Sequence, residues 1–384
     1  MSFEFATADK IIFGAGTALQ IGKLASGFGH KALVVFGKSF LKSHPIMQDL
    51  KAHGIQCECF RITKEPTVPM VMAGANKARR AACDVIIAIG GGSVIDSGKV
   101  IAALLTNQGD LYDYLETIGK GQAIINAPAP FLALPTTAGT GTEVTCNSVL
   151  ISPEHEVKVS MRSHLMLPKI AIIDPELTYS MPPSITANTG MDAITQLIEA
   201  FVSRDSNPLT DGICREGLMR AAGSMEKVFL DGSNIKARED MCIASLFGGI
   251  ALANAKLGAV HGIAGPLGGM YPSSHGGVCG RLLPFVMATN IAALKNRFPA
   301  SDALTRYKEI ARMVTGNLKA SALESVIWVQ NLCDSMGVAP LSRYGVHEKD
   351  IDRIVERSQK ASSMRGNPVQ LKKEELQDIL QQAL

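Results

Sequence analysis

The chain has 384 residues, of which 46% are hydrophobic and 19% are charged, and its formal net charge is only +3. Its length predicts two domains, because single hydrophobic cores stop growing near about 250–300 residues. Lys and Arg are spread along the whole chain, which argues against nucleic acid as a partner. No continuous apolar run reaches the roughly 18 residues of a membrane span, so no membrane partner is expected.

The N-terminus and the cysteines favour a cytoplasmic location. The first residues, MSFEFATADKIIF, lack the cationic start and apolar stretch of a signal peptide. The eight cysteines occur singly except for Cys57 and Cys59, and a CxC pair without a second pair is weak as a metal motif. We expect a structural role for this pair and reduced thiols throughout.

The first half of the chain alternates apolar runs with helical patterns. Nearly continuous apolar runs are typical of parallel strands that are covered on both faces. Their alternation with helical segments predicts a doubly wound α/β sheet. The expected strands are residues 32–37, 84–93, 131–139 and 169–175, and the expected helices between them include residues 68–82 and 96–107.

The pattern changes near residue 180. The segment MPPS at 181–184 ends the last strand region, and the pattern that follows is almost entirely helical. We therefore expect an α/β domain over residues 1–180 and an all-α domain over residues 181–384. A cleft between two such domains is the usual place for a binding site.

Two turns suggest a nucleotide. The motif GGGSVIDSGK (90–99) follows a strand and opens a helix, whose N-terminal N–H groups suit a phosphate. It matches neither GxGxxG nor GxxxxGK[ST], and a purely structural turn is about as plausible. The second turn, LPTTAGTGTEVT (134–145), offers hydroxyls for a ribose or pyrophosphate, although a flexible loop of small residues is the alternative. Two such turns after neighbouring strands favour a dinucleotide, because α/β sheets bind ligands at that edge.

The end of the first predicted strand indicates which dinucleotide. Enzymes that select NAD often carry an acid there, which bonds the ribose 2′-hydroxyl. This chain has Gly37 instead, followed by Lys38 and Ser39. A cation and a hydroxyl can bind a 2′-phosphate, so NADP is favoured over NAD, with an ordinary turn as the alternative.

Three residues predict a divalent metal site. Asp192 lies in the helical pattern TGMDAITQLIEAF, and His261 and His275 lie fourteen residues apart in the Gly-rich segment AVHGIAGPLGGMYPSSHGG. Two imidazoles and one carboxylate that converge form a metal site. One helical turn after Asp192 stands Gln196, whose side chain would project from the same helix face.

These segments together resemble the iron-containing (group III) alcohol dehydrogenases, which have the dehydroquinate synthase-like fold. The resemblance covers nearly the whole chain and rests on motifs in a fixed order. It implies an N-terminal dinucleotide domain, a helical C-terminal domain, an active site between them, and a homodimer or larger homo-oligomer. The motifs are DKIIFGAGT, GGGSVIDSGK, PTTAGTGTEVT, KIAIIDPELT, TGMDAITQLIEAFVS, GAVHGIAGPLGG…SHGG, LLPFVM and RGNP.

The resemblance also implies residues for the cofactor. In this family the GGGS turn binds the pyrophosphate, and the Thr-rich turn contacts the nicotinamide half. A lysine after the next β-hairpin makes a further contact, and the glycine at position 37 occurs in members that look NADP-dependent. The matching positions are Gly91, Gly92 and Ser93 for the first turn, Thr136, Thr137, Gly139 and Thr140 with Thr145 nearby for the second, and Lys158 for the lysine.

The metal ligands implied by the resemblance are an Asp and a His four residues apart, then two His fourteen apart. Asp192, His261 and His275 match, and Gln196 occupies the fourth place. Gln196 coordinates through its amide oxygen, or three protein ligands suffice, or the metal has been lost; a further alternative is a solvated glutamine beside two polar core histidines. Either iron (Fe2+) or zinc (Zn2+) suits this ligand set.

A second departure from the family is Gly265, where many members carry a histidine that helps to pass a proton. The missing side chain leaves room for a bulkier substrate. Hydroxyls from Tyr271, Ser273 and Ser274 in the following turn are candidates to contact it.

The expected reaction is reversible hydride transfer between NADP(H), or NAD(H), and a small alcohol, giving an aldehyde or ketone. Asp192, His261 and His275 are the expected catalytic residues, since the metal they hold polarises the oxygen. A dehydroquinate synthase-like lyase is one alternative, but the segment HGIAGPLGGMYPSSHGG is almost uncharged, which favours a neutral substrate. The other alternative is a nucleotide-binding protein that has lost its metal and its catalysis.

Overall fold

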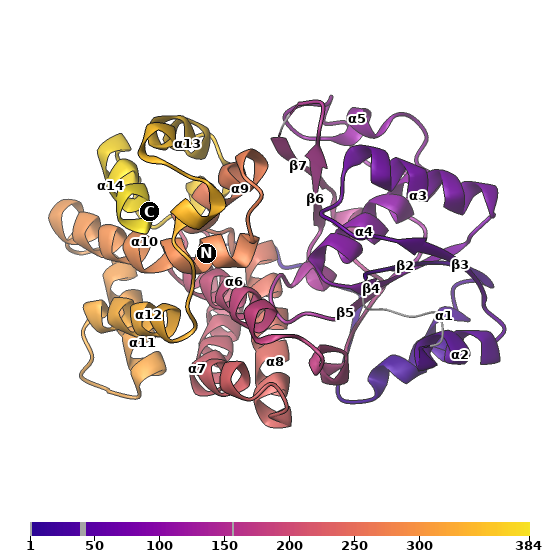
Figure 1. The fold of residues 1–384 in the computed structure, drawn as a ribbon, viewed down its shortest axis with the longest axis horizontal. Helices are drawn as coiled ribbons and strands as arrows, with labels where there is room; N and C mark the ends of the chain where they lie inside the picture. Colours follow the sequence, from indigo (N-terminus) through magenta and orange to yellow (C-terminus); the bar gives the residue numbers. More distant parts are fainter. Residues whose placement is uncertain (1, 39–43, 156) are drawn as a thin grey trace. The chain divides into compact units, whose positions relative to one another are not determined.

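The structure is a computed structural model that describes residues 2–38, 44–155 and 157–384. The chain divides into two compact units, which are described separately (Figure 1). Unit 1 contains the N-terminal segment up to Phe5, Ala138–Thr140 and Ser180–Leu384, and unit 2 contains Ala6–Thr137 and Gly141–Tyr179. The chain therefore passes from one unit to the other between residues 5 and 6, on either side of residues 138–140, and between residues 179 and 180.

Unit 2 is built on a parallel sheet, and the predicted α/β class is confirmed. The described residues form six strands in the order β1-β8-β5-β4-β2-β3, and every neighbouring pair is parallel. The four predicted strands correspond to β2, β4, β5 and β8. The strands are β1 (Lys10–Phe13), β2 (Lys31–Phe36), β3 (Gln56–Arg61), β4 (Val85–Gly90), β5 (Phe131–Pro135) and β8 (Ile170–Ile173).

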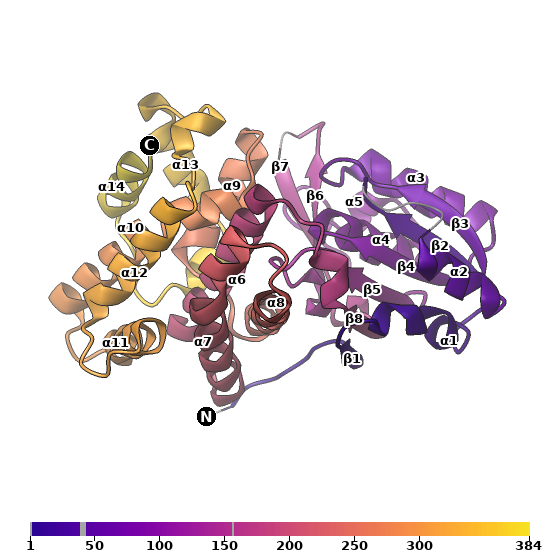
Figure 2. The same ribbon diagram turned by 60° about the horizontal axis from the view of Figure 1, so that its bottom comes forward.

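Helices cover both faces of this sheet (Figure 2). Along β2 the side chains alternate, so that Val34 joins the apolar cluster beneath α1 and α2, and Leu33 and Val35 join the cluster beneath α3 and α4. Burial on both faces explains why the central strands are apolar without alternation. The helices are α1 (Ile21–Ala25), α2 (Pro45–Ala52), α3 (Val68–Arg80), α4 (Gly92–Thr106) and α5 (Leu111–Tyr114).

The edge strands and a hairpin complete unit 2. The edge strand β3 has the sequence QCECFR, and its Cys57 and Cys59 pack against the cluster beneath α1 and α2, as expected for a structural pair. An antiparallel hairpin is formed by β6 (Asn147–Ser152) and β7 (Val157–Arg162). The resemblance implied a lysine after the hairpin. Lys158 is instead the second residue of β7, so it lies inside the hairpin.

Unit 1 is helical after residue 180, as the sequence predicts. The long helix α6 packs against α7, α8 and α10, and the residues of the candidate metal site come from α6, α9 and α10. The helices are α6 (Pro183–Val202), α7 (Pro208–Leu230), α8 (Ile235–Ala255), α9 (Ala259–Met270), α10 (His275–Arg297), α11 (Asp302–Thr315), α12 (Ala322–Ser335), α13 (Ile351–Ser358) and α14 (Lys373–Ala383).

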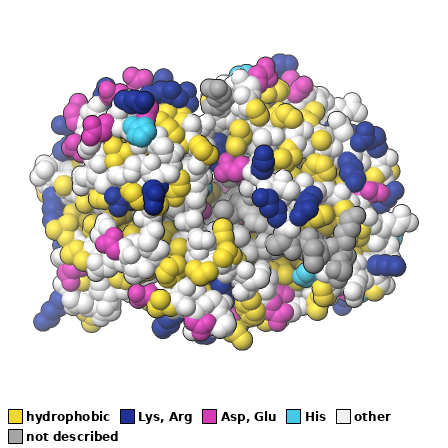
Figure 3. Space-filling view, in the orientation of Figure 1, with side chains coloured by type: hydrophobic (Ala, Val, Ile, Leu, Met, Phe, Trp, Pro, Cys, Tyr) yellow, Lys and Arg dark blue, Asp and Glu magenta, His cyan; other side chains and the backbone are white. Residues whose placement is uncertain are grey.

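Helix hydropathy and surface charge bear on possible partners. Helix α10 is long and apolar enough to cross a membrane, with a mean hydropathy of 1.4, but 72% of its most apolar window is buried inside the protein. A core helix has the same properties, so its composition alone is weak evidence of a span. Lys and Arg side chains are distributed over the visible face of each unit, with acidic and apolar side chains between them (Figure 3).

Candidate active site

The two predicted nucleotide turns begin side by side in unit 2. Strands β4 and β5 pair in parallel, with Gly90 opposite Pro135 at their carboxyl ends. The Thr136 N–H donates to the Gly90 carbonyl oxygen at 3.0 Å. A Cβ built on Gly91 would lie 3.4 Å from the side chain of Thr137. The structure therefore brings the first residues of both turns together.

The GGGS turn leads directly into a helix N-terminus. Gly91 is the N-cap residue of α4, and because glycine has no side chain it makes no side-chain capping hydrogen bond. The first-turn N–H groups at Gly92 and Ser93 are therefore oriented along the helix axis toward any bound anion, and the helix dipole favours one there. A Cβ on Gly90 would lie 2.5 Å from Val94, so only glycine allows this tight start.

A buried lysine, which the sequence analysis missed, holds the Thr-rich turn. Lys99 on α4 donates through Nζ to the carbonyl oxygen of Thr145 at 2.6 Å, to its Oγ1 at 2.8 Å, and to the carbonyl oxygen of Asn147 at 2.8 Å. Burial lowers the pKa of Lys99 to about 8, although the nearby Asp96 carboxylate opposes this shift. The Thr145 hydroxyl thus has a structural partner in Lys99. The sequence feature that could have indicated this contact is a single lysine in an otherwise apolar part of a helix.

The end of β2 offers a second cation besides Lys38. Arg61 is the last residue of β3, and its Nη2 donates to the carbonyl oxygen of exposed Lys38 at 2.9 Å. Gly37 has room for a side chain, because a built Cβ would lie 3.6 Å from Val94. Ser39 lies outside the described residues.

Two other implied cofactor positions are engaged within their own units. Lys158 forms an ion pair with Glu65, with Nζ and Oε2 2.8 Å apart. Residues 138–140 belong to unit 1, where Gly139 packs so tightly on α6 that a built Cβ would lie 2.7 Å from the Thr189 carbonyl oxygen. The carbonyl oxygen of Thr140 accepts a hydrogen bond from Gln196 Nε2 at 3.3 Å.

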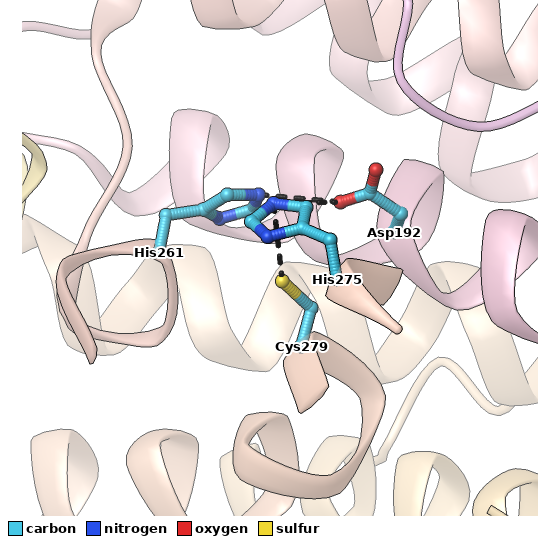
Figure 4. Close-up of side chains that lie close together, drawn as sticks. All are labelled: Asp192, His261, His275 and Cys279. Atoms are coloured by element: carbon cyan, nitrogen blue, oxygen red, sulfur yellow. Dashed lines mark hydrogen bonds and ion pairs between the residues drawn. The ribbon is translucent and has the colours of Figure 1, made fainter. Parts of the chain in front are cut away.

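In unit 1, four potential metal ligands converge from three helices (Figure 4). Asp192 comes from α6, His261 from α9, and His275 and Cys279 from α10, and one ligand atom of each lies within 4.8 Å of all the others. Asp192 Oδ1 is 3.3 Å from His261 Nε2 and 3.9 Å from His275 Nε2. The three predicted residues are therefore together, and Cys279 joins them.

Close packing of α10 on α6 produces this convergence. His275 is the first residue of α10, and Ser274 caps the helix by accepting from the Gly277 N–H. A Cβ on Gly276 would lie 2.0 Å from the carbonyl oxygen of Asn188 and 3.1 Å from the Cβ of Asp192. Glycine at position 276 thus lets the backbone of α10 approach α6 closely enough for the side chains to meet.

The buried carboxylate of Glu199, also missed from the sequence, orients His261. One of its oxygens accepts from the Val260 N–H at 2.6 Å, and the other lies 2.7 Å from His261 Nδ1. This arrangement places a ring proton on Nδ1 and directs Nε2 toward Asp192. A carboxylate behind a histidine is the usual support for a metal-binding imidazole. The signal was an acid seven residues after Asp192 in an otherwise apolar stretch of helix.

Charges within the group stabilise one another. Burial opposes a charged imidazole, but the Cys279 thiol and two neighbouring carboxylates outweigh it and hold the pKa of His261 well above its usual range. Cys279 is also the main cause of the raised pKa of His275. Burial likewise opposes a thiolate, yet the two histidines lower the pKa of Cys279. These directions favour a thiolate at Cys279 beside charged imidazoles.

Gln196 is buried and is not the solvated residue considered as an alternative. Only 2% of its surface is exposed. Its Nε2 donates to residue 140, while its buried Oε1 has no hydrogen-bond partner among the described residues and lies 2.8 Å from the position of a Cβ built on Gly248 of α8. The amide is thus directed toward residues 140 and 248.

The positions considered for substrate contact differ in what they offer. A side chain at Gly265 would meet no heavy atom within 4 Å at its Cβ, so there is open space at this position. Burial and a hydrogen bond to Asp350 raise the pKa of Tyr271, so its hydroxyl is engaged. Ser274 caps α10, whereas the buried Ser273 Oγ has no partner among the described residues.

Comparison with known proteins identifies the family. Residues 8–175 match the family model described as iron-containing alcohol dehydrogenase, and residues 186–384 match the C-terminal model of the same family. The chain is 34% identical to 1,3-propanediol dehydrogenase from Klebsiella pneumoniae, covering 99% of this chain and 98% of the relative. It is 32% identical to NADPH-dependent butanol dehydrogenase from Clostridium saccharobutylicum, covering 98% and 97% of the two chains.

A solved structure of 1,3-propanediol oxidoreductase superposes with a TM-score of 0.91 at 33% identity, covering 100% of both chains. The chain therefore belongs to the iron-containing alcohol dehydrogenase family, and it is an oxidoreductase that acts on alcohols and aldehydes with NAD(P) and a divalent metal. The expected family, fold class, activity and cofactors are confirmed at this level.

Proposed function

We propose that the protein reversibly reduces small uncharged aldehydes or ketones with NADPH, using a divalent metal that Asp192, His261 and His275 hold. The observation that carries the metal assignment is the orientation of His261. Glu199 occupies Nδ1 at 2.7 Å, so Nε2 is presented to Asp192 in the buried group. The donor set of one carboxylate, two imidazoles and a thiol suits a divalent ion.

The chain's own residues prepare this chemistry. A divalent ion at this position supplies Lewis-acid polarisation of the substrate oxygen. Asp192 contributes the negative charge that the ion requires, and Glu199 keeps His261 in the correct tautomer. Burial of Asp192 and His261 excludes water, which strengthens each electrostatic interaction inside the group. His275 is the more accessible imidazole, with 36% of its side chain exposed, so substrate reaches the centre from its side.

The preference for NADPH rests on the residues after β2 and β3. Gly37 brings no negative charge and is followed by Lys38, and the Arg61 guanidinium bonds the Lys38 backbone carbonyl oxygen at 2.9 Å, so Arg61 lies beside the segment that carries Lys38. Two cations attract the doubly charged 2′-phosphate that distinguishes NADP from NAD. We assign the pyrophosphate to Gly91, Gly92 and Ser93, where the α4 N-terminus offers its N–H groups. The nicotinamide half is assigned to the Thr-rich turn at residues 136–140.

The proposed substrate is small and neutral. The residues from His261 to His275 bring no charge apart from the two histidines, so a carboxylate or phosphate on the substrate would have no partner there. The open space at Gly265 accommodates a larger group on the carbonyl carbon. We further propose a cytoplasmic homodimer or larger homo-oligomer, which size-exclusion chromatography with light scattering tests.

The deciding experiment measures metal content and turnover together. Purified protein is analysed for metals and assayed for oxidation of NADPH and NADH with a series of short neutral aldehydes. We expect about one divalent ion per chain and faster oxidation of NADPH than of NADH. His275→Ala should lose the ion and reduce turnover by about a thousandfold or more, since a Lewis acid contributes several kcal/mol.

A matched control is His347→Ala, which removes an exposed histidine near the start of α13. That variant should keep both metal and activity. Full activity of His275→Ala would contradict the metal-assisted mechanism, and equal rates with NADH would contradict the cofactor assignment.

A further inference from the structure

We infer that Cys279, and not Gln196, completes the metal-binding set, and that the resident ion is therefore a thiol-seeking one such as Zn2+ instead of Fe2+. This inference deepens the proposed function and rests on the metal centre described there. It assigns a new ligand from the juxtaposition of four side chains in unit 1: Asp192, His261, His275 and Cys279.

The position of Cys279 on α10 makes it a natural partner of His275. The two residues are four apart, so their side chains project from the same helix face one turn from each other. Cys279 Sγ lies 3.7 Å from His275 Nε2 (Figure 4). Ligand bonds of about 2.0–2.3 Å in a tetrahedron give ligand–ligand separations of roughly 3.3–3.7 Å. The 3.3 Å between Asp192 Oδ1 and His261 Nε2 fits the same range.

The surroundings of Cys279 are unusual for a structural cysteine. A buried free thiol ordinarily packs as a small apolar group. The neighbouring buried Cys333 behaves in this way and donates to the Gly280 carbonyl oxygen at 3.2 Å. Cys279 instead has its sulfur among two imidazoles and a carboxylate, and none of its surface is exposed. This is the environment of a ligand.

Gln196 is committed elsewhere. Its amide nitrogen donates to the Thr140 carbonyl oxygen, and its Oε1 faces Gly248 on α8. Gln196 therefore connects the 138–140 segment to α6 and lies against α8. The unpartnered Oε1 favours glutamine as a ligand instead. The Gln196→Ala variant distinguishes the two assignments.

A thiol in the set changes which ion the centre prefers. Soft sulfur ligands select zinc, whereas iron(II) enzymes use imidazole, carboxylate and open positions. Zinc accepts Cys, His and carboxylate ligands in one site, and it expands to five-coordinate, so four protein ligands remain compatible with the proposed activity.

Cobalt spectroscopy tests the ligand directly, without reference to turnover. Metal-free protein is loaded with Co2+, and the near-ultraviolet spectrum is recorded, since only a coordinated thiolate gives a sulfur-to-cobalt charge-transfer band there. We expect the band in the wild-type protein and in Gln196→Ala, and its loss in Cys279→Ser with Co2+ still bound. Cys214→Ser removes a buried thiol on α7 of the same unit and should leave the band unchanged.

Competition for metals supplies the second readout. Offered equal Zn2+ and Fe2+, the wild-type protein should retain zinc, and Cys279→Ser should bind zinc at least about tenfold more weakly, as even a supporting residue costs that much. A wild-type cobalt protein without the band, or loss of cobalt in Gln196→Ala but not in Cys279→Ser, overturns the assignment of Cys279 while leaving the metal centre intact. A wild-type protein that binds neither cobalt nor zinc overturns both this inference and the metal part of the proposed function.

Discussion

The two predicted nucleotide turns and the candidate metal site of unit 1 depend on different parts of the chain. The turns present backbone N–H groups and small side chains, and their positions follow from glycines and from the pairing of β4 with β5. The centre depends on four side chains from three helices, each held by specific neighbours. A backbone site is robust to most substitutions around it, whereas a convergent side-chain site changes its chemistry with one residue.

The largest effect on stability is expected in unit 2 at Lys99, where one side chain holds a turn that otherwise depends on the backbone. Replacement by Met leaves three buried oxygen acceptors of Thr145 and Asn147 without their donor, so we expect a loss of about 3 kcal/mol in the free energy of unfolding. Denaturant unfolding measures it. Lys120→Met is the control, because that lysine is 71% exposed and pairs with Asp113 at the surface, where ion pairs contribute little. Equal losses in the two variants would show that Lys99 does not hold the turn.

The second prediction concerns buried Glu143 beside the same turn. Burial raises its pKa from 4.5 to about 7, so the folded state binds more protons than the unfolded state between these values. Stability from this group is therefore present below about pH 4.5 and is lost as the pH rises through 7. Glu143→Gln should be more stable than the wild type by up to about 3 kcal/mol at pH 8 and equal to it near pH 4. Thermal unfolding at both pH values checks this, and a constant difference would contradict the burial argument.

In unit 1 the corresponding test is Glu199→Gln, which sharpens the contrast. An amide supports the His261 tautomer less well and adds no charge, so metal affinity should fall by roughly 10–100-fold. Competition with a chromogenic chelator measures the affinity. Glu226→Gln, at an exposed position on α7, should have no effect. An unchanged affinity for Glu199→Gln would mean that the centre does not depend on its supporting shell.

The smallest effect is expected at Gly37. Gly37→Asp places a carboxylate where it repels a 2′-phosphate and bonds a 2′-hydroxyl, so the ratio of kcat/KM for NADPH over NADH should fall by about tenfold or more. Gly37→Ala is the control, since its Cβ meets only Val94 at an ordinary 3.6 Å. If both variants keep the same preference, the basic residues Lys38 and Arg61 decide the choice alone.

The fold could be predicted because its signals are local. Apolar runs gave β2, β4, β5 and β8, and the helical pattern after residue 180 gave the all-α part. The edge strand β3 was not predicted, because QCECFR lacks the continuous apolar character of a strand covered on both faces. Missing β3 did not affect the prediction that the two turns meet, because both turns follow the predicted strands β4 and β5, which pair with each other.

The candidate site could be predicted only where ligand spacing in sequence matches spacing in space. Asp192, His261 and His275 were predicted from their residue types and spacing, to which the family pattern was added, and the structure brings them together. Cys279 has the same four-residue spacing from His275 that Gln196 has from Asp192, but only the packing of α10 shows that its sulfur joins the group. Glu199 acts through His261 across 62 positions of sequence, a contact that no local pattern reveals.

The missing side chain at Gly276 has a consequence for how such centres are recognised. A methyl group there would lie 2.0 Å from the Asn188 carbonyl oxygen, so Gly276→Ala forces α10 away from α6 and separates Asp192 from His275. A homologue with alanine at this position would still carry every ligand and pass any search based on ligand identity. Database screens for this type of enzyme should therefore score the glycine after the last histidine together with the metal-binding residues.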